Sequence, residues 1–147
     1  MVSFRRMKLI TRDVDYAIRA LRYIAGVGGE RVAVPELAKR LKIPRPFLRK
    51  ILQVLHRRGI LKAYKGQGGG FQLARPAEEI LLINLIEIFR GRLVLNKCLF
   101  KKRLCGDVAT CALKGKIDAI ERRVVSELKA ITLKSLLEES PAHGYRA

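Results

Sequence analysis

Apolar residues recur every three or four positions in the first third of the chain, and this spacing predicts three helices. Thr11 or Asp13 is placed to cap the first helix, and Gly26 is placed to end it. The IPRP segment at residues 43–46 predicts a tight connection between the second and third helices. Two short helices joined in this way are typical of a helix-turn-helix. The predicted helices cover residues 14–25, 34–41 and 46–58.

The third predicted helix has one apolar face and one basic face, and Gly59 is placed to end it. In a helix-turn-helix, the second of the two helices enters the major groove of DNA. We expect the apolar face to bury Phe47, Leu48, Ile51, Val54 and Leu55.

Residues 60–64 and 71–74 predict two short strands around a glycine-rich loop, KGQGGG at 65–70. Four glycines in five positions permit a sharp turn and a close approach of the backbone to another surface. A nucleotide-binding phosphate loop is excluded, because no Gly-Lys-Ser/Thr follows and the loop precedes a strand. A hairpin directly after a helix-turn-helix is the element order of a winged helix.

The second half of the chain predicts a strongly apolar helix at 80–89, a loop at 91–110 and a long helix after it. The long helix carries one narrow apolar stripe, which favours pairing with another helix in a symmetric homodimer. Packing against its own domain would need a wider stripe. A capped final turn is expected at 132–137. The stripe consists of Leu113, Ile117, Ile120, Val124, Leu128 and Ile131.

The charge of the chain is strongly positive, with 31 Lys and Arg against 13 Asp and Glu, a net charge of +18. Residues 39–75 contain 11 Lys or Arg and no Asp or Glu. A folded surface of one sign indicates a polyanionic partner, either nucleic acid or an anionic membrane surface. No apolar run approaches the length of a membrane span, and the first residues lack the apolar stretch of a secretory signal. We therefore expect a cytoplasmic protein that binds nucleic acid and has no membrane partner.

The third helix and the glycine loop carry the side chains that we expect to contact double-stranded DNA. Arg and Lys donate to guanine O6 and N7, and Gln reads adenine N6 and N7. For each basic residue the alternative is a phosphate contact without sequence information, which we expect for Lys39, Lys42, Arg58 and Lys62. The expected DNA-binding residues are Arg45, Arg49, Lys50, Gln53, Arg57, Lys65, Gly66 and Gln67, with Arg49 and Lys50 favoured for base contacts.

The three cysteines of the chain, Cys98, Cys105 and Cys111, all lie in the predicted loop. Their odd number and close spacing disfavour a secreted disulfide scaffold and favour metal or redox chemistry. Structural zinc is disfavoured because zinc sites usually use tighter Cys pairs. Ordinary thiols and a disulfide switch stay open as alternatives.

Three segments resemble the Rrf-type winged-helix regulators, the family of the iron–sulfur regulators IscR, NsrR and RirA. These segments are DYAIRAL at 15–21, IPRPFL with KIL at 43–52, and KGQGGGFQL at 65–73; a late cysteine cluster before a long helix also matches. The similarity runs from about Lys8 to Leu137. The resemblance implies a DNA-binding homodimer built on the long helix, and a cysteine loop that binds a 2Fe–2S or 4Fe–4S cluster.

The resemblance also implies the ligands of that cluster. Cys98, Cys105 and Cys111 match the three late cysteines of the family. Some members place a histidine three residues after the third cysteine, where this chain has Lys114. Others use an aspartate from the first helix of the partner subunit, and Asp15 falls on that position, ahead of Asp13 and Asp107 as alternatives. Asp15 at a helix start is equally explained by the helix dipole.

The sequence thus predicts a mainly α fold with a small β-hairpin wing. It divides into a winged helix-turn-helix (8–91), a cysteine-containing loop (92–112) and a dimerisation helix (113–137). No nucleophile–base set or pair of carboxylates indicates an enzyme. We expect a transcriptional regulator that senses redox state, nitric oxide, iron or cluster supply through an iron–sulfur cluster. The alternative is a thiol-redox switch, or a basic nucleic-acid-binding protein without a cluster or signal.

Overall fold

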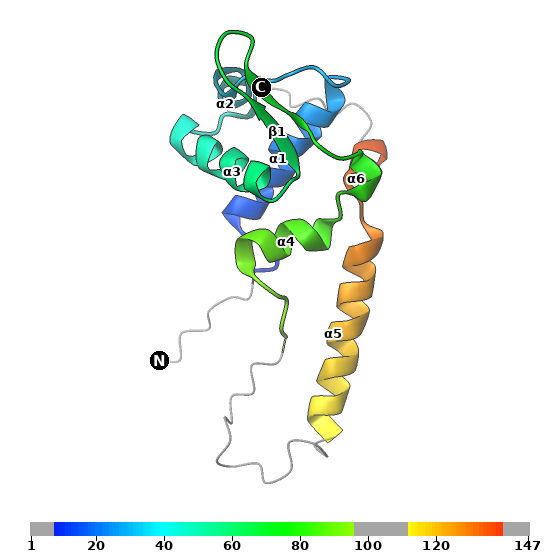
Figure 1. Ribbon diagram of the computed structural model, residues 1–147. Coiled ribbons are helices and arrows are strands. Elements are labelled where there is room, and N and C mark those ends of the chain that lie inside the picture. The colour runs from blue at the N-terminus through cyan, green and yellow to red at the C-terminus, as the bar shows by residue number, and fades with distance from the viewer. Residues whose placement is uncertain (1–7, 96–111, 140–147) are drawn as a thin grey trace, which may run out of the picture.

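The computed structural model describes residues 8–95 and 112–139 of the 147-residue chain. Within these ranges the fold is mainly helical with one antiparallel hairpin, so the predicted winged-helix class is confirmed (Figure 1). The elements are α1 (Arg12–Gly26), α2 (Val34–Leu41), α3 (Arg45–Arg57), β1 (Leu61–Tyr64), β2 (Gly70–Leu73), the 3-10 helix η1 (Ala77–Glu79), α4 (Leu82–Arg90), α5 (Ala112–Ala130) and α6 (Leu133–Glu138).

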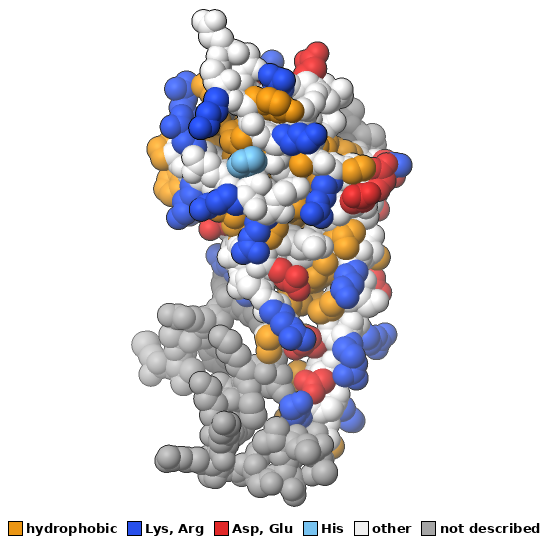
Figure 2. All heavy atoms as spheres, viewed as in Figure 1, with side chains coloured by type: hydrophobic (Ala, Val, Ile, Leu, Met, Phe, Trp, Pro, Cys, Tyr) orange, Lys and Arg blue, Asp and Glu red, His pale blue; other side chains and the backbone are white. Residues whose placement is uncertain are grey.

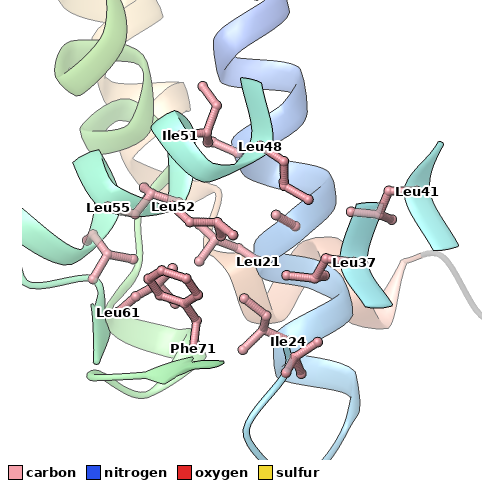
Figure 3. Packing of buried hydrophobic residues seen from close by; sticks show 14 of the residues in the cluster. Leu21, Ile24, Leu37, Leu41, Leu48, Ile51, Leu52, Leu55, Leu61 and Phe71 are labelled. Carbon is pink, nitrogen blue, oxygen red and sulfur yellow. The ribbon is translucent and has the colours of Figure 1, made fainter. Parts of the chain in front are cut away.

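Helix α1 is the central element, because it packs against α2, α3, α4, α6 and β2. It begins where the Thr11 hydroxyl accepts a hydrogen bond from the Val14 amide at 3.4 Å, so Thr11 and not Asp13 is the cap. Its buried face contributes to the main core, in which side chains from α1, α2, α3 and the hairpin converge (Figure 3). The α1 residues in this core are Ala17, Ala20, Leu21 and Ile24.

Helices α2 and α3 form the helix-turn-helix, and their bounds lie within one residue of the prediction. Lys42 ends α2 in the left-handed conformation, with φ of 54°, and the Ile43 amide donates to the Ala38 carbonyl at 3.2 Å. This turn satisfies a free carbonyl at the end of α2 and directs the chain straight into α3.

The predicted set of buried residues on α3 is wrong at Phe47. Phe47 is 55% exposed, and Leu52 is buried in its place beside Leu48 and Leu55. The physical reason is the helical phase: Leu48, Leu52 and Leu55 step by four and three along one side, whereas Phe47 lies off that side. Val54, also expected in the core, is only half-buried.

The hairpin pairs Leu61 with Leu73 and Tyr64 with Gly70, and it is one residue shorter at its open end than predicted. A bridge between Val32 and Phe71, with two hydrogen bonds of 2.9 Å, attaches the strand β2 to the segment before α2. Gly70 makes this close approach possible: its φ is 146°, and an added Cβ would collide with the Val32 carbonyl.

Helix α6 and the residues just before it pack back against the winged helix. Ile80 and Leu81, expected to be helical, are extended instead, and α4 starts at Leu82. They pair with the segment before α6, because the Leu133 amide donates to the Ile80 carbonyl at 2.8 Å. Thr132 and Ser135 form a capping box on α6, and Leu133 enters the main core at 1% exposure.

Helix α5 extends away from the winged helix (Figure 1). Its C-terminal end is fixed by Leu128, which packs in a second cluster with residues of α1 and α4, including Val14 and Ile86. Further along, Leu113 is 69% exposed and Ile120 is 49% exposed. Ile131, the last position of the predicted stripe, lies just beyond the helix. No helix in residues 8–95 or 112–139 is long and apolar enough to span a bilayer.

Replacing Leu133 tests whether α6 is part of the winged-helix core. Leu133→Ala leaves a cavity in the main core and is expected to lower the free energy of unfolding by roughly 2–5 kcal/mol. Urea denaturation measures this change. Lys129→Ala, an exposed position near the end of α5, is the control and should change the free energy by no more than about 0.5 kcal/mol. Equal stability of the two variants would contradict the packing of α6.

The glycines of the wing offer a second stability test. Gly70→Ala meets both an unfavourable φ and the Val32 carbonyl, whereas Gly66→Ala, at φ of 82°, meets no atom within 4 Å. We expect Gly70→Ala to destabilise by about 1–3 kcal/mol, and Gly66→Ala by clearly less. Thermal unfolding of the two variants compares them directly, and a larger effect at Gly66 would refute the close approach at Val32.

Candidate nucleic-acid interface

One face of α3 is exposed and carries no negative charge. Its residues fall between the buried leucines in the sequence, and the helical period places them on the side of α3 that faces away from the core. Figure 2 shows Lys and Arg side chains spread over this part of the molecule, with acidic side chains mainly at the right margin and along α5. We call this set the basic α3 face: Arg45, Arg49, Lys50, Gln53 and Arg57, all exposed.

The basic α3 face follows the geometry that a major-groove reader requires. Arg49, Gln53 and Arg57 are spaced four residues apart, so they form a stripe along the helix, and Lys50 lies beside it. Arg45 stands at the N-terminal end, the end of a recognition helix that approaches base edges. The structure therefore brings the five predicted α3 residues together on one exposed surface.

The wing presents the other three predicted residues. Lys65, Gly66 and Gln67 are exposed at the tip of the hairpin between β1 and β2. The hairpin is held by polar contacts: the Tyr64 hydroxyl donates to Gln72 at 3.1 Å, and the Gln72 amide donates to the Gly29 carbonyl. These contacts and the Val32–Phe71 bridge hold the wing next to the helix-turn-helix.

Two residues without a predicted role support this arrangement. The guanidinium of Arg31 lies 3.6 Å from the centre of the Tyr64 ring, which stacks a cation on the last residue of β1, next to the wing tip. His56 Nδ1 lies 3.0 Å from the Leu61 carbonyl, and because a carbonyl only accepts, Nδ1 donates this bond and ties α3 to β1. Neither contact follows a periodic pattern, so only the tertiary structure reveals them.

Helix α1 is connected to the helix-turn-helix by charged side chains. Arg19 donates to the Leu41 carbonyl at the end of α2 at 2.6 Å, and its guanidinium also lies 3.8 Å from the Asp15 carboxylate. The Tyr23 hydroxyl donates to Glu36 of α2 at 2.8 Å, and this hydrogen bond raises the pKa of Tyr23 above its ordinary value. Arg19 thus contacts both Asp15 and the turn that leads into α3.

The predicted metal ligands are only partly within the described residues. Cys98, Cys105, Cys111 and Asp107 lie outside them. Asp15 is described, and its side chain is 53% exposed; Asp13 is exposed as well. In residues 8–95 and 112–139, no group of three His, Cys, Asp or Glu side chains could hold a metal ion.

The structure describes the residues on either side of the cysteine segment, 96–111. The Leu95 amide donates to the Glu121 carboxylate of α5 at 2.9 Å, so the chain is held against α5 just before the segment. The described chain resumes at Ala112, the first residue of α5. Lys114, at the position where some relatives have a histidine, forms an ion pair with Asp118 at 2.7 Å.

Sequence comparisons place the chain among transcriptional regulators. The sequence profile of the Rrf2 family, described as "Iron-dependent Transcriptional regulator", matches residues 10–139. A protein of Aquifex aeolicus (strain VF5) assigned as an HTH-type transcriptional regulator is 34% identical over 137 residues, which cover 92% of this chain and 95% of the relative. Protein aau3 of Rhizobium meliloti (strain 1021) is 29% identical over 133 residues, 90% of this chain and 86% of that protein.

Solved structures share the fold. CymR (YrzC), the global cysteine regulator of B. subtilis, superposes with a TM-score of 0.75 at 18% identity, over 90% of this chain and 98% of CymR. IscR of T. potens has a TM-score of 0.68 at 23% identity, over 92% of this chain and 93% of IscR. The resemblance to Rrf-type regulators is confirmed. The chain belongs to the Rrf2 family of transcriptional regulators, a family of regulators and not of enzymes.

Proposed function

We propose that this protein is a sequence-specific DNA-binding regulator that acts as a homodimer and whose DNA affinity is controlled by an iron–sulfur cluster. The observation that carries the proposal is the exposed basic α3 face beside the wing, in a stretch of 37 residues, 39–75, without Asp or Glu. The cluster would be held by Cys98, Cys105, Cys111 and Asp15 of the partner subunit.

In this proposal α3 reads base edges while surrounding cations bind phosphates. Arg49 and Lys50 donate to guanine, and Gln53 pairs with adenine in the major groove. Lys65, with its neighbours Gly66 and Gln67, reaches the adjacent groove from the wing. Exposed cations outside the basic α3 face position the duplex by phosphate contacts: Lys39, Lys42, Arg58 and Lys62.

A pair of variants separates base reading from phosphate binding. Arg49→Ala should weaken binding to the cognate operator by roughly 1–3 kcal/mol and leave binding to random DNA almost unchanged. Lys39 is an exposed cation on α2. Lys39→Ala should weaken binding to both DNAs and reduce the magnitude of the slope of log K against log salt concentration by about one. Fluorescence anisotropy at several salt concentrations measures both effects. Equal losses on both DNAs for Arg49→Ala would show that this residue does not read bases.

The apolar side of α5 supports the homodimer. Ile120, Val124 and Leu128 line a shallow groove with Arg123 and Glu127, and Leu113 lies two helical turns before Ile120 on the same side. Winged helices of this kind read two half-sites as symmetric dimers. A second α5 laid along this groove would remove Leu113 and Ile120 from water.

Introducing a charge into this groove tests the dimer. Ile120→Asp buries an unpaired carboxylate in the proposed helix–helix contact and should give a monomer that loses affinity for a two-half-site operator. Ser126→Asp, on another side of α5, introduces the same charge at an exposed position and should leave the dimer intact. Analytical ultracentrifugation distinguishes the two. A dimeric, stable Ile120→Asp protein would refute the role of this side of α5.

The donor set fits an iron–sulfur cluster chemically. Thiolates are soft ligands that suit iron–sulfur clusters, and nearby Lys and Arg favour their deprotonation. Asp15 adds a carboxylate that is accessible from solvent. When bound, the cluster would supply a redox- and iron-sensitive centre whose retention depends on the cellular signal.

Arg19 offers a physical route from Asp15 to the DNA-reading helix. Its guanidinium contacts both the Asp15 carboxylate and the Leu41 carbonyl. If Asp15 binds a metal ion instead, Arg19 loses this ion pair, and its hydrogen bond to Leu41 changes with it. Leu41 immediately precedes the turn into α3. A bound cluster changes the DNA affinity only if it binds more tightly to one of two conformations, the one that binds DNA or the one that does not.

Anaerobic purification tests the cluster and its ligands. The protein should be brown with sulfur-to-iron absorption, and Cys105→Ala should lose most of that absorbance. Asp15→Ala should keep a cluster of altered spectrum and lability, because solvent or a small thiol replaces one oxygen ligand. Asp13→Ala, an exposed acid in the same turn of α1, is the control and should match the wild-type spectrum. A colourless protein that takes up no iron on reconstitution would refute the cluster and support the thiol switch.

A further inference from the structure

Phe47 is a large apolar side chain exposed to solvent on the DNA-reading helix. It is 55% exposed and lies in the first turn of α3. The other large apolar side chains exposed in the described ranges lie at the start of α1, after α4 and on α5: Ile10, Val94, Leu113 and Ile120. Among these exposed apolar side chains of the described ranges, Phe47 is therefore the one that lies on α3.

The fold does not use Phe47 for its own core. Leu48, Leu52 and Leu55 supply the buried side of α3, and the main core does not include Phe47. Pro44 and Pro46 flank the start of the helix and are also exposed, and their fixed φ angles hold this turn rigidly. The phenyl ring is thus exposed to solvent on a first helical turn whose backbone is conformationally restricted.

The charges around Phe47 indicate its partner. Arg45, Arg49 and Lys50 are its exposed neighbours on α3, and the absence of acidic residues in 39–75 disfavours contact with an equally cationic surface of a second copy. DNA is the polyanion that this surface fits. In the major groove the apolar group that a side chain can meet is the C5-methyl of thymine, for which Phe is a known type of contact.

We propose that Phe47 packs against a thymine methyl group in the major groove and is a specificity-determining residue of the operator. The inference rests on the proposed function of α3 as the recognition helix. Its neighbours donate to guanine O6 and N7, so each half-site should contain a thymine close to guanine. The N-terminal turn of a recognition helix is the part that contacts base edges, which is where Phe47 lies.

Replacing thymine by uracil in the operator removes this methyl group and nothing else. Operators are first selected by the full-length protein from a random-sequence duplex pool, and each thymine is then replaced singly by uracil. At one thymine in each half-site, uracil should weaken wild-type binding by about fourfold, the effect of burying one methyl-sized group. Phe47→Ala should bind the thymine and uracil operators equally, and Phe47→Leu should keep part of the discrimination.

Matched variants make the outcomes distinguishable. Gln53→Ala should lose affinity and still discriminate thymine from uracil at that position, because the methyl contact stays. If no uracil replacement affects the wild type while Arg49→Ala still loses operator affinity, the role of Phe47 is overturned and the proposed function stands. Selection that enriches no sequence overturns the proposed function itself.

Two further results would also overturn the inference. If Phe47→Ala retains the thymine preference at every position, another residue reads the methyl group. If Phe47→Ala dissociates the protein in sedimentation experiments, the occupant of this surface is a second copy of the chain and not DNA. Circular dichroism and thermal unfolding of Phe47→Ala should match the wild type, since the side chain lies outside the core.

Discussion

Burial of the apolar face of α1 is the interaction on which the other elements depend. Ala17, Ala20, Leu21 and Ile24 enter the main core, and Val14, one turn earlier, enters the second cluster with α4 and α5. One helix thus joins the winged helix to the element that carries the exposed apolar groove. Loss of this packing would separate α3 from α5, whereas a small shift of α1 would displace both α3 and α5.

The charges are arranged around this core in a way that suits a regulator. The basic α3 face and the wing both lie on the surface of the winged helix. Their relative positions are fixed by contacts of four residues: Arg31, Tyr64, Gln72 and His56. The same α1 carries Asp15 and Arg19, whose contact with Leu41 reaches the turn before α3. In the proposed function, α1 therefore carries the candidate cluster ligand and contacts both the helix-turn-helix and α5.

Helical periodicity predicted most of the fold, because amphipathic helices bury most of their apolar positions against one core. It failed at Phe47, where an apolar residue faces solvent, and at Ile80 and Leu81, whose pairing with the segment before α6 requires a distant part of the chain. The candidate DNA contacts were predictable from exposed cations on a helix after a turn. Arg31, His56 and Arg19 were not, because their partners lie far away in sequence or outside any repeat pattern.

Hydroxyl-radical footprinting on a selected operator, combined with the stoichiometry of the complex, tests the central claim most directly. Two chains joined along α5 should protect two symmetric half-sites on one side of the duplex, with centres about 10 base pairs or a multiple of that apart. Sedimentation should give two chains per operator. One protected segment bound by a single chain would contradict the account of a dimer that presents two recognition helices.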